Sequence, residues 1–280
     1  MNNACDSSST PKLIRSLHLT GDVAKSCHRC IGVLAMLVCA ACAHAAGLPD
    51  TGQTTCYDGS AMVACSKANA GDAAAYPRQD GRFGRDPEAA AGKAAKIGGG
   101  AAGFDYTKIA NNGSILAATT ALGSAAGDWA CTRDNITGLV WEVKANAGLR
   151  SQSDTYSWYS SNASTNAGNA GVVSGGNCQS AGRCDTEKFA ADVNAVALCG
   201  YSDWRMPSLR ELLTLVHAGA GSPSIEISYF PNTPASNFWA ATSFVGDTAK
   251  AWNIDFYDGG TYTSSRGGSG YVRLVFGAPF

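Results

Sequence analysis

LCGYSDWRMPSLRELL, residues 198–213, is the stretch on which the fold depends. Cys199 lies at the end of one predicted helix, a short extended segment follows it, and a second helix begins after that segment. Ser208 is a predicted N-cap of that helix, and Glu211, three residues later, completes a capping box. Pro207 fixes the preceding backbone as extended and ends the segment. The pattern is typical of a structural junction, so Trp204, Arg205 and Pro207 are not expected to contact a ligand.

Helices are predicted on both sides of this junction, and strands beyond them. The first helix covers 186–198, capped by Asp185 or Thr186, with an apolar face of Phe189, Val193, Val196 and Ala197. The second covers 208–218. A buried strand is expected at 139–143, and alternating patterns predict strands at 237–244, 251–257, 261–266 and 271–276. The expected order is therefore a strand, a long loop, two helices and then several strands.

The N-terminus has the features of an export signal. Four basic residues precede the apolar run 31–42, and Ala43-His44-Ala45 is a small-residue cleavage site. The run is too short for a good membrane span. We therefore predict a signal peptide over 1–45 and a secreted, periplasmic or cell-surface location. Lipidation at Cys42 is the weaker alternative, because Cys39 stands where an aliphatic residue is wanted.

The cysteine count agrees with export. Five of the eleven cysteines lie in the leader, which leaves an even set of six and predicts three disulfides in an oxidising compartment. Six cysteines allow fifteen pairings. The preferred pairing is local for Cys56–Cys65 and Cys178–Cys184, with Cys131–Cys199 as the long-range bridge. A zinc site is the competing interpretation, but the mature chain has no C-x-x-C pair.

Charge excludes one class of partner. The leader holds four of the 21 basic and two of the 22 acidic residues, so the mature chain has a net charge of about −3. It contains no run of Lys or Arg, whereas a nucleic-acid partner requires a basic patch.

Residues 46–127 are rich in Ala and Gly and are predicted to be a loosely structured lead-in. The compact domain is predicted over 128–280.

Several motifs in this order resemble the Lcl C-terminal domain family of exported bacterial proteins, over most of the mature chain. They are CTRDNITGLVWE (131–142), CGYSDWRMPS (199–208), YFPNT (229–233), FWAATS (238–243), the ending 251–275 and the lead-in LPDTGQT with CYD at 48–58. The family has no settled general activity and is named for an adhesin whose C-terminal domain binds sulfated glycans. The 204–211 segment is also similar to formylglycine-generating-enzyme-like domains. The resemblance implies a C-type-lectin-like α+β fold, with two helices flanking small antiparallel sheets and long loops, and the expected order of elements fits it.

Two regions are candidate ligand contacts. The first is the long polar loop 151–176, where Tyr156, Trp158 and Tyr159 stand among Ser and Asn, the composition of adaptable recognition surfaces. The second is a hairpin around Asp258-Gly259-Gly260. A two-residue turn would bring Tyr262, Ser264 and Arg266 to the face that holds Asn253, Asp255 and Tyr257, and a three-residue turn would not. The simpler alternatives are a loop that packs on the domain and an ordinary solvated sheet face.

The sequence favours recognition over catalysis. The single mature histidine, His217, has no G-x-S-x-G elbow beside it, and paired cysteines would leave no reactive thiol. No cofactor is indicated, and calcium is possible without a motif for it. We therefore expect a non-enzymatic adhesion or recognition domain that binds a glycan or a surface protein. The negative charge favours a neutral ligand over a sulfated one. The alternatives are a secreted enzyme of unknown type and a structural cell-envelope protein.

Overall fold

A computed structural model describes residues 50–65 and 76–280 of the 280-residue chain. All of these residues fall within one compact unit, 46–280. The predicted signal peptide and the possible lipidation site at Cys42 lie outside the described residues.

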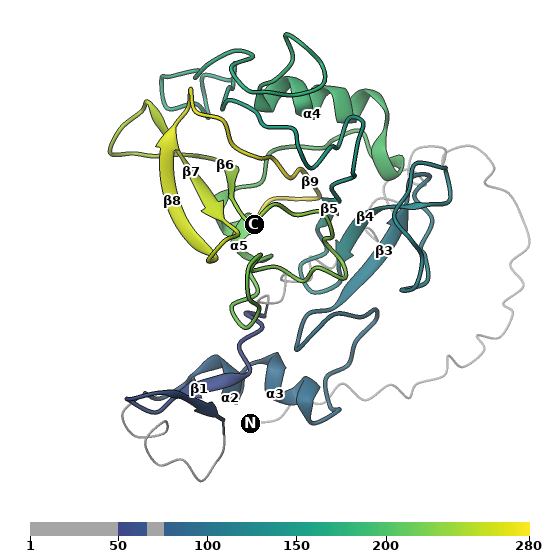
Figure 1. The fold of residues 1–280 in the computed structure, drawn as a ribbon, viewed down its shortest axis with the longest axis vertical. Coiled ribbons are helices and arrows are strands. Elements are labelled where there is room, and N and C mark those ends of the chain that lie inside the picture. The colour runs from purple at the N-terminus through teal and green to yellow at the C-terminus, as the bar shows by residue number, and fades with distance from the viewer. Residues whose placement is uncertain (1–49, 66–75) are drawn as a thin grey trace, which may run out of the picture. The chain divides into compact units, whose positions relative to one another are not determined.

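The central sheet has four antiparallel strands in the order β3-β4-β5-β9 (Figure 1). The strands are β3 (Tyr106–Ala110), β4 (Trp129–Asp134), β5 (Val140–Glu142) and β9 (Val275–Phe276). Adjacent residues of a strand point to opposite faces, and every residue of β5 is buried, so both faces of this sheet are covered. The lead-in 46–127 is therefore not loosely structured throughout, since it supplies β3.

Two apolar clusters cover the two faces of the central sheet. Trp141 packs in one cluster with Phe230 and Phe238, while the preceding residue, Val140, packs in the other with Phe189. The expected strand at 139–143 is confirmed. Its continuous apolar character follows from burial on both sides.

The second sheet is a three-stranded meander, β6-β7-β8. It consists of β6 (Asn237–Ser243), β7 (Lys250–Asp255) and β8 (Gly260–Ser265), which lie together in Figure 1. The register places Asn253 opposite Tyr262 and Asp255 opposite Gly260. Odd residues thus pair with even ones, as the two-residue turn predicted, although the connection is longer than two residues. The predicted final strand, 271–276, is reduced to β9.

Both predicted helices are shorter than expected. Helix α4 spans Thr186–Ala195 and is capped by Asp185, whose side chain accepts the Lys188 N–H. It stops there because Ala197 adopts a left-handed backbone with φ of 46°, and Val196, predicted on the buried face, is exposed. A 3₁₀ turn at Leu198–Gly200 follows.

Helix α5 spans only Leu209–Leu213. The capping box is present: Glu211 N–H donates to Ser208 Oγ, and Ser208 N–H donates to the Glu211 carboxylate. After Leu213 the next three amides bond to carbonyls three residues back instead of four, so the α-helix tightens into turns, and the amides after them bond to distant parts of the chain. His217 N–H donates to Ser224 O, and Ala218 N–H donates to Thr51 O.

The N-terminal part is a small hairpin followed by two short helices. Strands β1 (Thr55–Tyr57) and β2 (Met62–Ala64) pair antiparallel, and α2 (Asp80–Phe83) and α3 (Arg85–Ala90) follow. Gly81 allows α2 to approach β1, since a Cβ there would lie 2.8 Å from Thr55 O and from Cys65 Sγ.

The three predicted disulfides are confirmed. Cys56–Cys65 closes the N-terminal hairpin, Cys178–Cys184 closes a loop before α4, and Cys131–Cys199 joins β4 to the 3₁₀ turn. The structure is therefore a disulfide-bonded α+β domain with several small antiparallel sheets.

Candidate functional site

The candidate site is a pocket of about 310 Å³ between the polar loop, the first turn of α4 and the extended part of the junction. We call it the loop–helix pocket. It is lined by Trp158, Tyr159, Ser160, Asn162, Thr165, Thr186, Glu187, Ala190, Trp204, Arg205, Met206 and Ala241. Three segments far apart in the sequence thus contribute aromatic, amide, carboxylate and guanidinium groups to one cavity.

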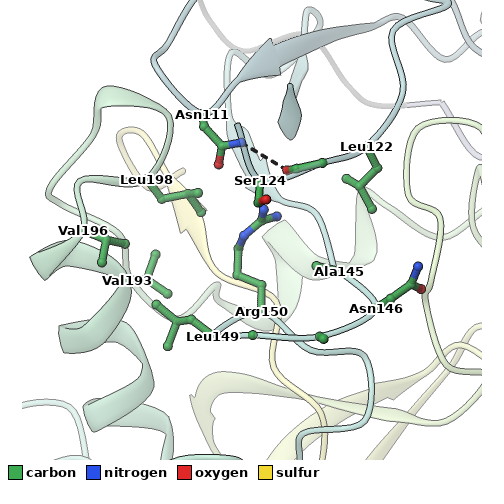
Figure 2. Close-up of a pocket in the computed structure, with 13 residues that line it drawn as sticks. Asn111, Leu122, Ser124, Ala145, Asn146, Leu149, Arg150, Val193, Val196 and Leu198 are labelled. Atoms are coloured by element: carbon green, nitrogen blue, oxygen red, sulfur yellow. Dashed lines mark hydrogen bonds between the residues drawn. The ribbon is translucent and has the colours of Figure 1, made fainter. Parts of the chain in front are cut away.

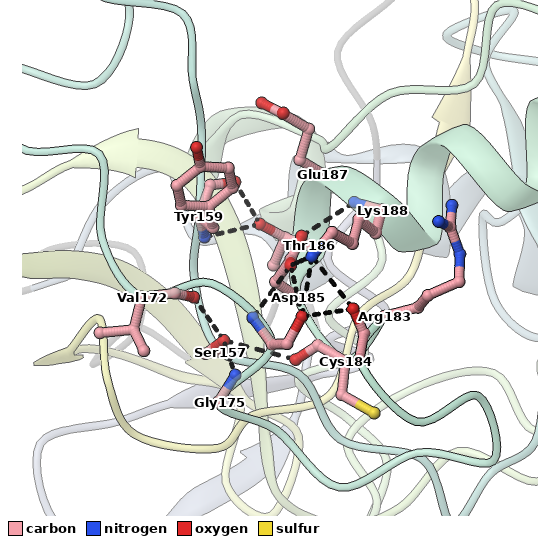
Figure 3. Close-up of polar contacts among 12 residues, drawn as sticks. Ser157, Tyr159, Val172, Gly175, Arg183, Cys184, Asp185, Thr186, Glu187 and Lys188 are labelled. Carbon is pink, nitrogen blue, oxygen red and sulfur yellow. Dashed lines mark hydrogen bonds and ion pairs between the residues drawn. The ribbon is translucent and has the colours of Figure 1, made fainter.

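Thr186 fixes the position of Tyr159 in this pocket. The Tyr159 N–H donates to Thr186 Oγ1 at 3.0 Å, and the Thr186 hydroxyl donates to Tyr159 O at 2.8 Å (Figure 3). Thr186 is 1% exposed, so this double contact is shielded from water. In Figure 3 the Tyr159 ring and the Glu187 carboxylate both point away from the buried polar contacts beneath them. The start of the helix therefore holds the aromatic residue of the loop in a defined place.

Asp185 and Ser157 anchor the same loop from below. The Asp185 carboxylate caps α4, accepts the Ser174 N–H at 3.0 Å and lies 3.2 Å from Lys188 Nζ. Ser157 Oγ donates to Val172 O at 2.7 Å (Figure 3). Buried polar groups that are fully satisfied stiffen a loop. The long polar segment is thus ordered by its own hydrogen bonds and by α4.

Arg205 forms the opposite wall. Its guanidinium donates to both carboxylate oxygens of Glu211, at 2.9 and 2.6 Å, and to Gly277 O at 3.0 Å. Burial alone would raise the pKa of Glu211, but hydrogen bonds from Arg205 and from Ser208 N–H outweigh it and hold that pKa below its ordinary value. The bidentate contact fixes a half-buried cation at the edge of the pocket.

Two tryptophans form the base of the pocket. Trp158 and Trp204 are each 2% exposed. Trp158 Nε1 donates to Ala240 O at 2.9 Å, and Trp204 Nε1 donates to Leu198 O at 3.1 Å. Because their polar atoms are already bonded, the rings present only carbon to the cavity.

Four of the eight predicted ligand residues are buried and make contacts within the domain. Tyr156 stacks on Phe189, and Asn253 donates to Ser264 Oγ. Trp158 packs against the Arg266 guanidinium, which lies 3.8 Å from the ring centroid. Arg266 donates to the carbonyls of Asn166 and Asn169, so the polar loop covers that end of the hairpin face. Of these four residues, Trp158 lines the loop–helix pocket, and Tyr156 lines a separate small cavity of about 110 Å³.

The other four predicted residues are accessible. Tyr159 lies in the loop–helix pocket. Asp255, Tyr257 and Tyr262 lie at the β7–β8 hairpin, where Tyr257 is 66% and Tyr262 is 48% exposed. The Tyr262 hydroxyl donates to Asp258 at 2.7 Å. The loop and the hairpin tip thus form two separate surfaces.

Sequence reasoning missed Glu187, Met206 and Asn162 as pocket residues and set Arg205 aside as structural. Strand alternation gave no signal for Arg205, because it places this residue opposite Trp204, and both line the pocket. Nothing in the sequence showed that the loop would fold over that segment.

A larger cavity of about 560 Å³ lies at the C-terminal end of α4, against Val193 and Val196 (Figure 2). Its polar side chains are largely committed to backbone groups. Arg150 donates to Ala130 O and Val143 O, and Asn111 Nδ2 donates to Gly123 O, Ala125 O and Asp128 O. This cavity therefore offers fewer free polar groups for recognition than the loop–helix pocket.

Fold and site together define a disulfide-bonded α+β domain with a tryptophan-based pocket beneath an ordered polar loop. The chain belongs to the Lcl C-terminal domain family, whose profile matches residues 130–276. The match contains the whole loop–helix pocket and the Cys131–Cys199 disulfide. No curated protein and no solved structure matches the chain. Among residues 50–65 and 76–280, no helix has the length and apolar character needed to cross a membrane.

Proposed function

We propose that this chain is an exported, non-enzymatic recognition protein and that the loop–helix pocket binds a glycan. The observation that carries the proposal is the composition of the pocket. Carbon atoms of Trp158, Trp204 and Met206 line it, although the two tryptophans are each only 2% exposed, and the polar groups of Asn162, Glu187 and Arg205 also line it. A sugar ring has an apolar face bordered by hydroxyls, so this arrangement matches both parts of it.

The order of the pocket supports binding without large rearrangement. Thr186 bonds both backbone groups of Tyr159, and Glu211 holds Arg205 through two hydrogen bonds. A preorganised site loses less conformational entropy when a ligand binds. At about 310 Å³ the pocket is at the small end of ligand sites, which fits a terminal sugar rather than a long chain.

The charges favour a neutral ligand. The Glu187 carboxylate lines the pocket and accepts the Ser161 N–H at 2.6 Å. Arg205, the cation of the pocket, is already paired with Glu211. A sulfate group would meet the negative charge of Glu187 and a guanidinium already paired with Glu211, whereas a hydroxyl can bond to either group.

The C-type-lectin-like fold and export belong to the same proposal. Three features support the fold assignment: β9 pairs in the same sheet as β4 and β5, the helices α4 and α5 lie between these strands in the sequence, and the long loop before α4 is ordered. Three disulfides support passage through an oxidising compartment.

A glycan array with the purified chain tests the binding proposal. We expect signals from neutral glycans. The glycan with the strongest signal should bind the Glu187→Gln variant with an altered affinity. Mass spectrometry should show that this glycan is chemically unchanged after incubation with the chain. Conversion of the glycan to product would favour the enzyme alternative. An empty array with a co-purifying envelope protein would favour a structural role.

The β7–β8 hairpin carries a second candidate function, contact with a surface protein. Tyr257 and Tyr262 are exposed beside Asp258, and exposed tyrosines are frequent anchors of protein interfaces. If this surface binds a protein, Tyr257→Ala should abolish co-purification of the partner and leave glycan binding unchanged. The opposite pattern would assign the partner to the pocket.

A further inference from the structure

Three carboxylates from separate segments meet in the N-terminal part of the domain, away from both surfaces described above. Asp50 precedes the first hairpin, Asp80 begins α2, and Asp86 lies in the first turn of α3. One carboxylate oxygen of each lies within 4.8 Å of the others. This spacing is compatible with three oxygen atoms that coordinate one ion.

Two of the three side chains are buried and only half bonded. Asp50 is 6% and Asp86 is 1% exposed. Asp50 Oδ1 accepts the Thr51 N–H at 3.0 Å, and Asp86 Oδ1 accepts the Gly103 N–H at 2.7 Å. The Oδ2 atoms of both residues are buried without a hydrogen-bond partner. A buried carboxylate oxygen without a partner is costly and calls for a proton donor or a cation.

The surrounding cations do not supply that partner. Lys96 Nζ donates to the carbonyls of Gly100 and Ala102, and Arg85 Nε donates to Gly103 O. Within residues 50–65 and 76–280, no lysine or arginine forms an ion pair with any of the three carboxylates. Burial, together with the adjacent Asp86 carboxylate, raises the pKa of Asp50 to about 7. Burial lowers the pKa of Lys96, whereas Asp50 and Asp86 each act to raise it, so this cation lies near the cluster, but it donates no hydrogen bond to either carboxylate and their Oδ2 atoms stay without partners.

The backbone at Gly103 is shaped around the same cluster. A Cβ at this position would lie 1.6 Å from Asp50 Oδ2 and 2.5 Å from Arg85 Cβ. Only glycine therefore allows the chain that leads into β3 to approach the carboxylates so closely.

We propose that Asp50, Asp80 and Asp86 bind a divalent cation of the calcium class. Three carboxylates with no histidine or cysteine among them form a hard, oxygen-only ligand set. The ion would join the residue before the disulfide-closed hairpin to α2 and α3, and through Gly103 to the start of the central sheet. Its role is structural, because none of its ligands lines the loop–helix pocket.

Isothermal titration of the chelator-stripped full chain with CaCl₂ tests this site, with MgCl₂ in a parallel titration. We expect one calcium per chain and a rise in Tm when calcium is added. Asp80→Asn is the principal variant, because Asp80 is the least buried of the three residues and its replacement is the least disruptive to folding. It should weaken calcium binding by at least about tenfold. The matched control, Asp203→Asn, removes an exposed carboxylate outside the cluster and should bind as the unmodified chain does.

Absence of calcium binding and of a Tm shift in the unmodified chain would overturn the proposal and would indicate a shared proton between Asp50 and Asp86. Unchanged binding by Asp80→Asn, or equal weakening in Asp203→Asn, would place the ion elsewhere and would also overturn it.

Discussion

Replacement of Thr186 by valine should loosen Tyr159 without a change in shape. Threonine and valine are nearly isosteric, so the substitution removes the hydroxyl and leaves no cavity. The hydroxyl makes two contacts, with Tyr159 N–H at 3.0 Å and with Tyr159 O at 2.8 Å. At about 1 kcal/mol for each hydrogen bond, the free energy of unfolding of the variant should be about 2 kcal/mol lower than that of the unmodified chain. Some of this cost is offset because Tyr159 is only half buried and water can reach it.

The same loss should appear in ligand affinity. If the free energy that holds Tyr159 in place must be supplied by the glycan, a cost of about 2 kcal/mol weakens binding by up to about thirtyfold. Urea unfolding measures the first quantity, and isothermal titration with the best array ligand measures the second.

Two further variants isolate the hydroxyl. Thr186→Ser keeps it and should retain most of the stability and affinity, whereas Thr261→Val makes the same exchange at an exposed strand position and should change stability by less than about 0.5 kcal/mol. Equal losses in Thr186→Ser and Thr186→Val would show that the methyl group matters and would refute the reasoning.

Three predictions concern stability. Replacement of both Cys131 and Cys199 by alanine opens a loop with a sequence separation of 68 and should cost about 4 kcal/mol in urea unfolding; a cost below 1 kcal/mol would contradict the entropic account. Lys144 is fully buried, and its Nζ lies 3.1 Å from the Glu142 carboxylate in the unmodified chain. Glu142→Gln removes this counter-charge and should lower the free energy of unfolding by about 3–5 kcal/mol, and adding Lys144→Met to it should restore part of the loss. Glu211 has a folded-state pKa below its ordinary 4.5, so its stabilising effect is complete above about pH 4.5 and is lost as the pH falls through the folded value. Glu211→Gln should therefore show a weaker dependence of stability on pH in this acid range, and an unchanged slope would contradict the assignment.

Local signals predicted local structure well. The capping box of Ser208 and Glu211 depends on residues three apart, and the pairing of Asn253 with Tyr262 depends on one hairpin, so both could be inferred from the sequence. The early end of α5 could not, because after Leu213 the amides bond three residues back instead of four, and the chain then turns away to meet distant Thr51 through Ala218 N–H.

The site was harder to predict for the same reason. Alternation correctly grouped Arg266 with the polar side of the hairpin, but the 160–170 part of the loop covers that side, and its path depends on contacts with α4. Arg205 lines a pocket only because the same loop folds over the segment that contains it. Period-two patterns show which residues share a face, and they do not show which non-local segment covers that face.

The most direct measurement of the central claim is the affinity of the best array glycan for three proteins: the unmodified chain, Tyr159→Ala and Tyr257→Ala. Both substitutions remove a tyrosine side chain, one from the loop–helix pocket and one from the exposed hairpin. The glycan-pocket account predicts a loss of at least about tenfold for Tyr159→Ala and no measurable change for Tyr257→Ala. Full affinity in Tyr159→Ala, or a selective loss in Tyr257→Ala, would contradict it.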